Sequence, residues 1–253
     1  MPALDTANRQ IVLRIVYDGP GFAGKTTNLR QLTKFFSLLK RSELSTPEEA
    51  DGRTRYFDWM HIDGGLVAGH GLRCQFVTVP GQNYLAHRRQ AVLLTADIVV
   101  FVAESTPVGA TAAQPLIEHM EQWFEDQHTE LPPLLLQANK QDLPAAISAD
   151  ELALKLGLDA DTPRVGAQAT QGLGVRETAV LAIRAAAQGV AAQITRHGLE
   201  NLPRRVQSQN DLLVSMMDDM DTLAPPPPGD EADGAEVVGV EFEVPSGRPP
   251  PVP

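Results

Sequence analysis

The chain has 253 residues, of which 43% are hydrophobic, enough to bury one good-sized core. Its formal net charge is −11, but ten acidic residues and one basic residue from Asp211 onward account for −9, which leaves about −2 for the first 210 residues. A nearly neutral body lacks the basic face typical of nonspecific nucleic-acid binding. The single cysteine, Cys74, excludes an internal disulfide and a cysteine-based zinc cluster. Because we find neither a signal peptide nor a long apolar run, we expect a cytoplasmic protein without a membrane span.

A glycine-rich loop follows the first β-branched run, residues 11–17. The loop reads GPGFAGKT from Gly19 to Thr26, and a helical pattern extends from Lys25 to about residue 39. A strand, a G-x-x-x-x-G-K-[ST] loop and a helix in this order predict a phosphate-binding P-loop, whose backbone N–H groups face an anion. Lys25 would reach the β- and γ-phosphates, and Thr26 would ligate Mg²⁺. The alternative is a glycine-rich turn that only resembles the motif.

The elements that follow alternate between strand and helix patterns. Residues 56–62 and 72–79 read as two strands of a hairpin, joined across a glycine-rich segment. Further strands are expected at 98–103, 134–138 and 164–167, and further helices near 84–95, 111–127, 149–156 and 175–194. This order predicts an α/β fold in which helices flank a mostly parallel, six-stranded sheet.

The string Asn139-Lys140-Gln141-Asp142 directly follows the apolar strand at 134–138. In a parallel sheet, ligands bind beyond the C-terminal ends of the strands, where this string and the P-loop both lie. A carboxylate at Asp142 can accept hydrogen bonds from the N1–H and N2–H₂ groups of guanine, a pair of donors that adenine lacks. Alone, N-K-x-D could be an ordinary polar turn before Pro144. Downstream of a P-loop, it predicts a guanine-nucleotide site.

With these motifs the chain resembles the Ras-like small GTPases of the P-loop NTPase class, and more closely the bacterial MglA-like type that governs cell polarity and gliding motility. The resemblance covers about residues 11–194. It is carried by GPGFAGKTTN at 19–28, RTRYFD at 53–58, TVPGQ at 78–82 and N-K-x-D at 139–142. Most small GTPases have an aspartate where this chain has Thr78, and T-V-P-G-Q is characteristic of the MglA-like group.

The resemblance implies a role for each residue that matches a family motif. Gln82 would orient the attacking water, and Gly81 would donate its N–H to the γ-phosphate. Thr54 would reach Mg²⁺ only when the γ-phosphate is present. Arg53 would act as an arginine finger from within the chain. Its alternative is a solvated loop arginine, and the nearby Arg55 complicates the assignment.

The resemblance also implies the outline of the whole site. Gln82, Arg53 and Lys25 would be catalytic, and Thr26 and Thr54 would be metal ligands. GTP or GDP would bind to Gly19, Gly21, Ala23, Gly24, Lys25, Thr26, Thr27, Thr54, Gly81, Asn139, Lys140, Asp142 and Ala169. The last contact, from the Ala169 N–H to guanine O6, rests on a loop that sequence defines poorly. Gly21 would sit against the γ-phosphate.

These roles predict a GTP-hydrolysing switch with Mg²⁺ as cofactor. Its partners would read two switch segments, one around Thr54 and one around Gln82, and the resemblance suggests a Roadblock-type activating protein among them. Two alternatives remain: a signalling scaffold that binds GTP without hydrolysing it, and a P-loop phosphotransferase that acts on a small molecule. The intact Gln82 and Arg53 argue against the first, and N-K-x-D argues against the second.

Residues near the switch segments carry more than one interpretation. Phe57 and Trp59 read as packing residues of the hairpin or as part of a partner surface. Arg88 and Arg89 follow Gln82 along the next helix, where a solvated face and a partner contact are both open.

The GTPase domain is expected at residues 9–195, followed by an extension. Apolar residues recur among charges at 204–223, which predicts a helix with one apolar stripe from about Ser208 within an extension at 196–223. This helix would either dock on its own domain or capture another protein. Residues 224–253 form a Pro-rich acidic tail that predicts disorder or polyproline structure. Alternating apolar residues at 237–244 would add a strand to a sheet edge, or are only a short hydrophobic patch.

Overall fold

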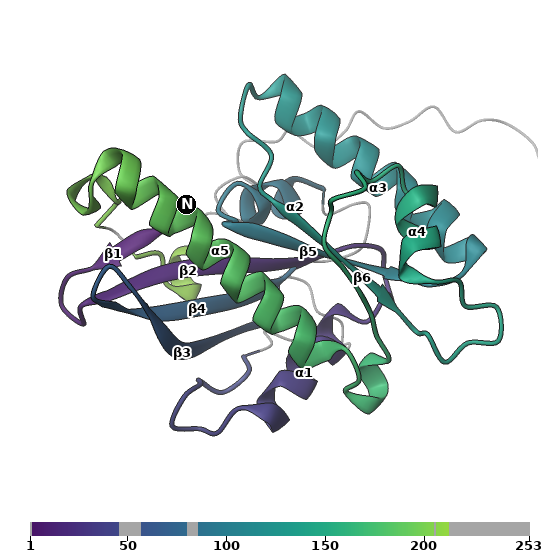
Figure 1. Ribbon diagram of the computed structural model, residues 1–253, viewed down its shortest axis with the longest axis horizontal. Helices are drawn as coiled ribbons and strands as arrows, with labels where there is room; N and C mark the ends of the chain where they lie inside the picture. The colour runs from purple at the N-terminus through teal and green to yellow at the C-terminus, as the bar shows by residue number, and fades with distance from the viewer. Residues whose placement is uncertain (1, 46–56, 80–85, 205, 213–253) are drawn as a thin grey trace, which may run out of the picture. The chain divides into compact units, whose positions relative to one another are not determined.

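The computed structural model describes residues 2–45, 57–79, 86–204 and 206–212. In these ranges the chain forms one sheet in the order β3-β4-β2-β5-β6-β7, with β1 paired to β2 outside that order (Figure 1). The strands are β1 Ala3–Asp5, β2 Gln10–Asp18, β3 Trp59–Val67, β4 His70–Thr78, β5 Ile98–Glu104, β6 Leu134–Asn139 and β7 Arg164–Gly166. Neighbouring strands from β4 through β7 are parallel, and β1 and β3 are antiparallel to their neighbours.

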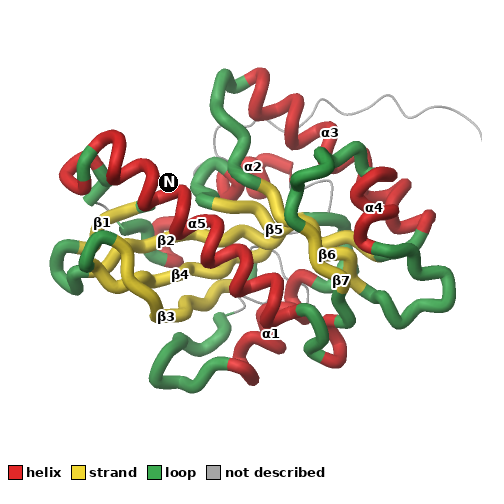
Figure 2. The backbone as a smooth tube through the Cα atoms, in the orientation of Figure 1, coloured by secondary structure: helices red, strands yellow, loops and turns green. Residues whose placement is uncertain are grey.

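Helices cover both faces of the sheet. They are α1 Lys25–Phe35, α2 Ala86–Leu93, α3 Pro107–Asp126, α4 Ala149–Lys155 and α5 Val175–His197. Alternate residues of β2 face opposite layers, so Ile15 packs with α1 and α5, whereas Val16 packs with α2 and α3. Figure 2 shows α5 crossing in front of the strands. β2 is therefore buried on both faces, as its mostly apolar sequence predicts.

A buried polar network fixes the helix that follows the P-loop. Asn28 on α1 and Gln137 on β6 exchange two amide hydrogen bonds at 2.7 and 2.9 Å. Gln137 also donates to the hydroxyl of Thr178 on α5 at 2.9 Å. Because buried amides must be paired, this network sets the position of α1 against the sheet.

The six expected strands are all present, and the short β1 is a seventh strand in the described residues. The hairpin is longer than expected: β3 runs to Val67 and β4 starts at His70, so most of the glycine-rich segment lies inside it, with an irregularity between Asp63 and Leu66. Helix α3 starts at Pro107 instead of about 111, because the Thr106 hydroxyl caps it by accepting the Gly109 N–H at 2.9 Å.

The first part of the extension lies against the domain. The Leu4 N–H donates to the Pro203 carbonyl at 2.7 Å, and the Arg14 guanidinium donates to Gln207 Oε1 at 2.9 Å. A helical turn at 209–212 buries Leu212 in the apolar cluster that contains Trp59. Docking on its own domain is thus what the described part of the extension does. The rest of the expected helix and the Pro-rich acidic tail lie outside the described residues.

None of the helices in the described part of the chain has the length and apolar character that a membrane crossing requires.

Candidate functional site

The glycine-rich loop adopts a backbone that only glycine fits at two positions. Gly19 and Gly24 have φ values of +131° and +108°. A Cβ on Gly19 would overlap the carbonyl oxygen of Val102, and a Cβ on Gly24 would overlap the side-chain amide of Asn139. The loop therefore needs these two glycines both for its conformation and for close packing against β5 and β6.

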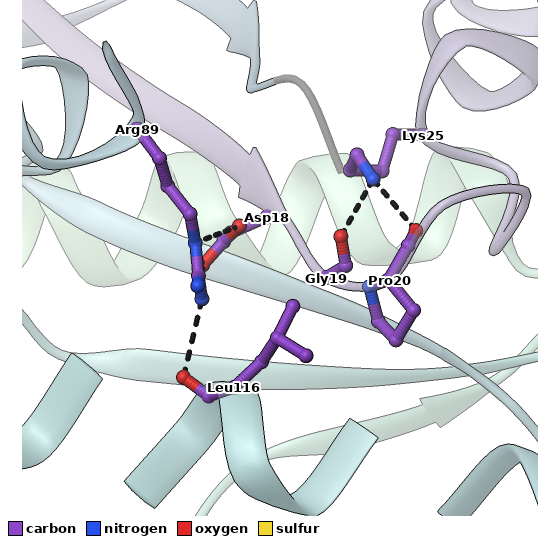
Figure 3. A network of polar contacts seen from close by, with 6 residues as sticks. All are labelled: Asp18, Gly19, Pro20, Lys25, Arg89 and Leu116. Carbon is purple, nitrogen blue, oxygen red and sulfur yellow. Dashed lines mark hydrogen bonds and ion pairs between the residues drawn. The ribbon is translucent and has the colours of Figure 1, made fainter. Parts of the chain in front are cut away.

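Lys25 folds back over this loop. Its Nζ donates to the carbonyl oxygens of Gly19 at 2.6 Å and Pro20 at 2.8 Å (Figure 3). The residue is buried, and desolvation lowers the pKa of the ammonium to about 8, although the carboxylates of Asp18 and Asp58 oppose this shift. A cation with few hydrogen-bond partners beside a loop of backbone N–H groups fits an anionic ligand.

Thr26, the predicted Mg²⁺ ligand of the loop, contacts the carboxylate of Asp58, for which the sequence motifs predict no role. Its Oγ1 donates to Asp58 Oδ2 at 2.6 Å, and Thr78 Oγ1 donates to the same oxygen at 2.9 Å. The Asp58 N–H in turn donates to Thr78 Oγ1 at 2.9 Å. Asp58 has no exposed surface. The carboxylate that position 78 lacks is thus supplied from the adjacent antiparallel strand segment.

The oxygen donors of this arrangement fit a Mg²⁺ ion. The Thr26 proton is directed at Asp58, so the hydroxyl oxygen keeps its lone pairs for a cation. Hydroxyl and carboxylate oxygens are the hard ligands that Mg²⁺ prefers. A buried carboxylate behind the ligating hydroxyl provides the outer-shell support that metal ligands normally have.

Asn139 joins the P-loop to the loop that contains Ala169, and both loops are predicted to contact the nucleotide. Its Nδ2 donates to the Ala23 carbonyl at 2.7 Å, and its Oδ1 accepts the Ala169 N–H at 2.9 Å. This second bond corrects one expectation, since the Ala169 N–H assigned to guanine O6 is already engaged with Asn139. The next backbone N–H along this loop belongs to Thr170. No pattern in the sequence distinguishes Ala169 from Thr170 as the donor to guanine, because the register of this loop depends on its packing.

The other residues of the N-K-x-D string lie in a turn after β6. Lys140 has a φ of +64° and forms an ion pair with Glu104 at 2.6 Å. Asp142 is exposed and therefore accessible to a ligand beyond the strand ends. Glu104 was not singled out from the sequence, and its position opposite Asn139 in the β5–β6 pairing brings it to Lys140.

Among the loop residues expected to bind nucleotide, Gly21 is exposed and Thr27 is half-buried in the first turn of α1. Arg53, Thr54, Gly81 and Gln82 lie outside the described residues. The described part of the site brings together the P-loop, the Thr26–Asp58 pair and the N-K-x-D turn at the C-terminal ends of β2, β5 and β6.

Arg89 has neither of the roles expected for it. Its guanidinium donates to both carboxylate oxygens of Asp18, the residue that precedes Gly19, at distances from 2.6 to 3.0 Å (Figure 3). Its Nη2 also donates to the Leu116 carbonyl on α3 at 3.2 Å. The residue therefore forms an internal ion pair and is not on a solvated face. Phe57 and Trp59 are buried and pack with Val16, as one of their two interpretations predicts.

Comparison with known proteins gives the family. No family model matches the chain. The mutual gliding-motility protein MglA of Myxococcus xanthus (strain DK1622) is 33% identical over 201 residues, which cover 78% of this chain and 100% of that protein. The ADP-ribosylation factor-like protein 4C of Homo sapiens is 31% identical over 147 residues, 58% of this chain and 69% of that protein. The chain belongs to the MglA-like small GTPases of the Ras-like superfamily.

Proposed function

We propose that the protein is a GTP-binding and GTP-hydrolysing switch that uses Mg²⁺. The observation that carries this proposal is the contact between Thr26 Oγ1 and Asp58 Oδ2 beside the P-loop. It restores a carboxylate next to the metal-ligating hydroxyl in a chain whose Thr78 departs from the usual motif.

The phosphates would lie on the loop between Gly19 and Thr26. Backbone N–H groups and the Lys25 ammonium would bind the β- and γ-phosphates, and Thr26, supported by Asp58, would hold Mg²⁺ together with Thr54. The bound metal ion would offset the phosphate charge. The Lys25 ammonium is already aimed at this loop by the carbonyls of Gly19 and Pro20, so little reorganisation is needed on binding.

Hydrolysis would depend on positioning and charge stabilisation. Gln82 would orient the attacking water, Gly81 would donate its N–H to the γ-phosphate, and Arg53 would offset the negative charge of the transition state. Gly21, which would face the γ-phosphate, leaves room for these groups because it has no side chain.

Guanine would be selected at the opposite end of the site. Asp142 would accept from the N1–H and N2–H₂ groups of the base, and Lys140 would lie beside it, held by Glu104. Asn139 would act indirectly by joining the P-loop to the Ala169 loop. The backbone that follows Ala169, starting at Thr170, would meet the guanine O6.

The wider role rests on the relative. MglA of Myxococcus xanthus is named for gliding motility, and we extend this to a role in cell polarity, motility or another signalling process inside the cytoplasm. A Roadblock-type activating protein and effectors would read the two switch segments. In this organisation residues 9–195 form the GTPase domain, 196–223 a helical extension and 224–253 an acidic tail.

Phosphate release tests the proposal against its alternatives. Purified protein with Mg²⁺ is expected to release phosphate from GTP without a second substrate, and not from ATP. Release that requires a small-molecule acceptor would indicate a phosphotransferase. Tight GTP binding without any release would indicate a scaffold, and equal use of ATP would contradict the role of Asp142.

A further inference from the structure

A buried ion pair joins the residue before the P-loop to the helix after the second switch segment. Arg89 on α2 donates from Nε to Asp18 Oδ1 at 2.9 Å and from Nη2 to Asp18 Oδ2 at 2.6 Å. The Asp18 side chain has no exposed surface, and that of Arg89 is 12% exposed. Two such hydrogen bonds fix the orientation of a guanidinium as well as its position.

The pair connects three elements of the domain. Asp18 is the last residue of β2 and directly precedes Gly19, Arg89 lies in α2, and the same guanidinium donates to the Leu116 carbonyl of α3 at 3.2 Å. Figure 3 shows the Arg89 side chain extending from its helix to Asp18, with the Leu116 carbonyl beyond it. Helix α2 is thus attached to the strand that begins the P-loop by a specific contact, in addition to its apolar packing.

The two charges also act on the phosphate site. The Asp18 carboxylate raises the pKa of Lys25 and the Arg89 guanidinium lowers it, so both charges are close enough to affect the ammonium. A bare carboxylate next to this loop would repel phosphate. Arg89 compensates that charge, and the pair adds little net charge to the site.

The position of Arg89 along the chain gives this contact a role in the reaction. Helix α2 starts at Ala86, directly after the segment 80–85 that contains Gly81 and Gln82. Because residues 80–85 follow β4, which pairs with the P-loop strand β2, and directly precede α2, a contact that fixes α2 against β2 fixes the point at which this segment ends. A displacement of about 1 Å in a catalytic group can reduce a rate by about a hundredfold.

We propose that Arg89 is a positioning residue for GTP hydrolysis: its ion pair with Asp18 holds α2 against the start of the P-loop and so places the segment that carries Gln82. The proposal rests on the function proposed above. It predicts that loss of the pair affects hydrolysis of bound GTP separately from nucleotide affinity.

The test compares four variants of the full-length chain preloaded with GTP in Mg²⁺. Arg89→Met removes the guanidinium at similar length, Arg89→Lys keeps the charge without the fork, and Asp18→Asn/Arg89→Met removes both charges. Arg196→Met is the control, since it removes the same charge from an exposed position in the last turn of α5. Nucleotide affinity, single-turnover hydrolysis and the thermal midpoint are measured for each.

We expect Arg89→Met to weaken nucleotide binding, because Asp18 is then uncompensated, and to slow hydrolysis at least tenfold, on the order expected for a small displacement. The double variant is expected to recover the affinity but to stay slow, with Arg89→Lys between it and the wild type. Arg196→Met is expected to match the wild type. Hydrolysis at the wild-type rate in the double variant would overturn the proposal, as would a rate loss explained entirely by a lower fraction of folded protein.

Failure of the proposed function gives a different result. If the wild type binds guanine nucleotide but never hydrolyses it, the proposed switch function is wrong. The effect of the ion pair on α2 is then measured by hydrogen–deuterium exchange of that helix in the GDP-bound protein. Faster exchange in the double variant would show that the pair holds the helix. Unchanged exchange would overturn that part of the proposal as well.

Discussion

At the scale of single residues, the site depends on where a carboxylate is supplied. Thr78 occupies a position where most small GTPases have an aspartate, and Asp58 reaches both Thr78 and Thr26 from the neighbouring strand segment. The carboxylate therefore reaches the Thr26 hydroxyl from the strand segment next to Thr78. The chemistry of the metal site depends on which groups meet, and different backbone positions can bring the same groups together.

The variant Asp58→Asn tests whether the Asp58 carboxylate supports the metal site. The amide can still accept from Thr26 but carries no charge, so we expect Mg²⁺ affinity of the nucleotide complex to fall about 10- to 100-fold, the usual effect of removing an outer-shell partner. The measurement is the GDP dissociation rate as a function of free Mg²⁺. An unchanged Mg²⁺ dependence would show that Asp58 does not support the metal.

The double variant Asp58→Asn/Thr78→Asp is the matched control. It returns the carboxylate to the position that most small GTPases use, and we expect it to recover part of the lost Mg²⁺ affinity. If both Asp58→Asn and the double variant bind Mg²⁺ equally poorly, the loss reflects damage to the β3–β4 hairpin and not a missing charge.

The lowered pKa of Lys25 predicts that nucleotide binding is linked to proton uptake. Burial lowers its pKa to about 8 in the free protein, and a bound phosphate favours the charged ammonium and raises that pKa. Binding near pH 8 should therefore take up as much as about half a proton, whereas binding near pH 6 should take up none through this group. Calorimetry of GDP binding in two buffers of different ionisation enthalpy measures this uptake. No difference between the two pH values would contradict it.

Most residues of the site could be identified from sequence, because the P-loop and N-K-x-D are contiguous strings whose spacing carries their mechanism. Asp58 could not, because its role depends on strand pairing across 20 residues of chain. The absence of a carboxylate at Thr78, with an aspartate at the end of the first switch string, was the available signal. The ion pair of Arg89 could not be predicted for the same reason, since Asp18 is 71 residues away.

At the scale of elements, the loops at the strand ends are joined to one another before any ligand binds. Asn139 at the end of β6 contacts both the P-loop and the loop after β7, through the Ala23 carbonyl and the Ala169 N–H. The strands themselves followed from their patterns, since buried β-branched runs are strong signals. The three-residue β1 is too short to show a strand pattern. The full length of the β3–β4 hairpin could not be predicted, because glycines within it are typical of a loop.

Asn139→Ala tests the connection between these loops. It removes two hydrogen bonds and leaves two buried backbone groups unpaired, so we expect GDP to dissociate at least about tenfold faster. The measurement is the release of labelled GDP under excess unlabelled nucleotide. The control is Gln141→Ala, whose amide donates within its own loop, to the Ile147 carbonyl at 3.0 Å. Equal release rates in the two variants would show that the loops are positioned by other contacts.

At the scale of the whole molecule, the described start of the extension completes the domain. Arg14 is buried in the sheet, where desolvation lowers its pKa to about 10. Its guanidinium donates to Gln75 at 2.9 Å and to Gln207 of the extension at 2.9 Å, and lies 5.3 Å from the Trp59 ring centre. Leu212 is fully buried in the cluster that contains Trp59. This docking could not be predicted from composition, because it depends on the hydrogen bond from the buried Arg14 guanidinium to Gln207.

Truncation tests the contribution of this segment. A chain that ends at residue 205 loses the hydrogen bonds from Arg14 to Gln207 and the burial of Leu212, and we expect its free energy of unfolding to fall by about 3 kcal/mol. A chain that ends at 212 keeps these contacts and is the matched control, expected to be more stable than the chain that ends at 205 by this amount. Denaturant unfolding of all three measures the difference. Equal stability of the two truncated chains would contradict a structural role for residues 206–212.

The most direct test of the central claim is single-turnover hydrolysis of GTP by the purified protein in Mg²⁺, compared with Arg53→Ala and Gln82→Leu. The account predicts measurable turnover in the wild type and loss of most of it in each variant, with guanine-nucleotide affinity retained. Turnover in the wild type that survives both substitutions would contradict the assigned catalytic residues. Absence of turnover in the wild type would contradict the switch itself.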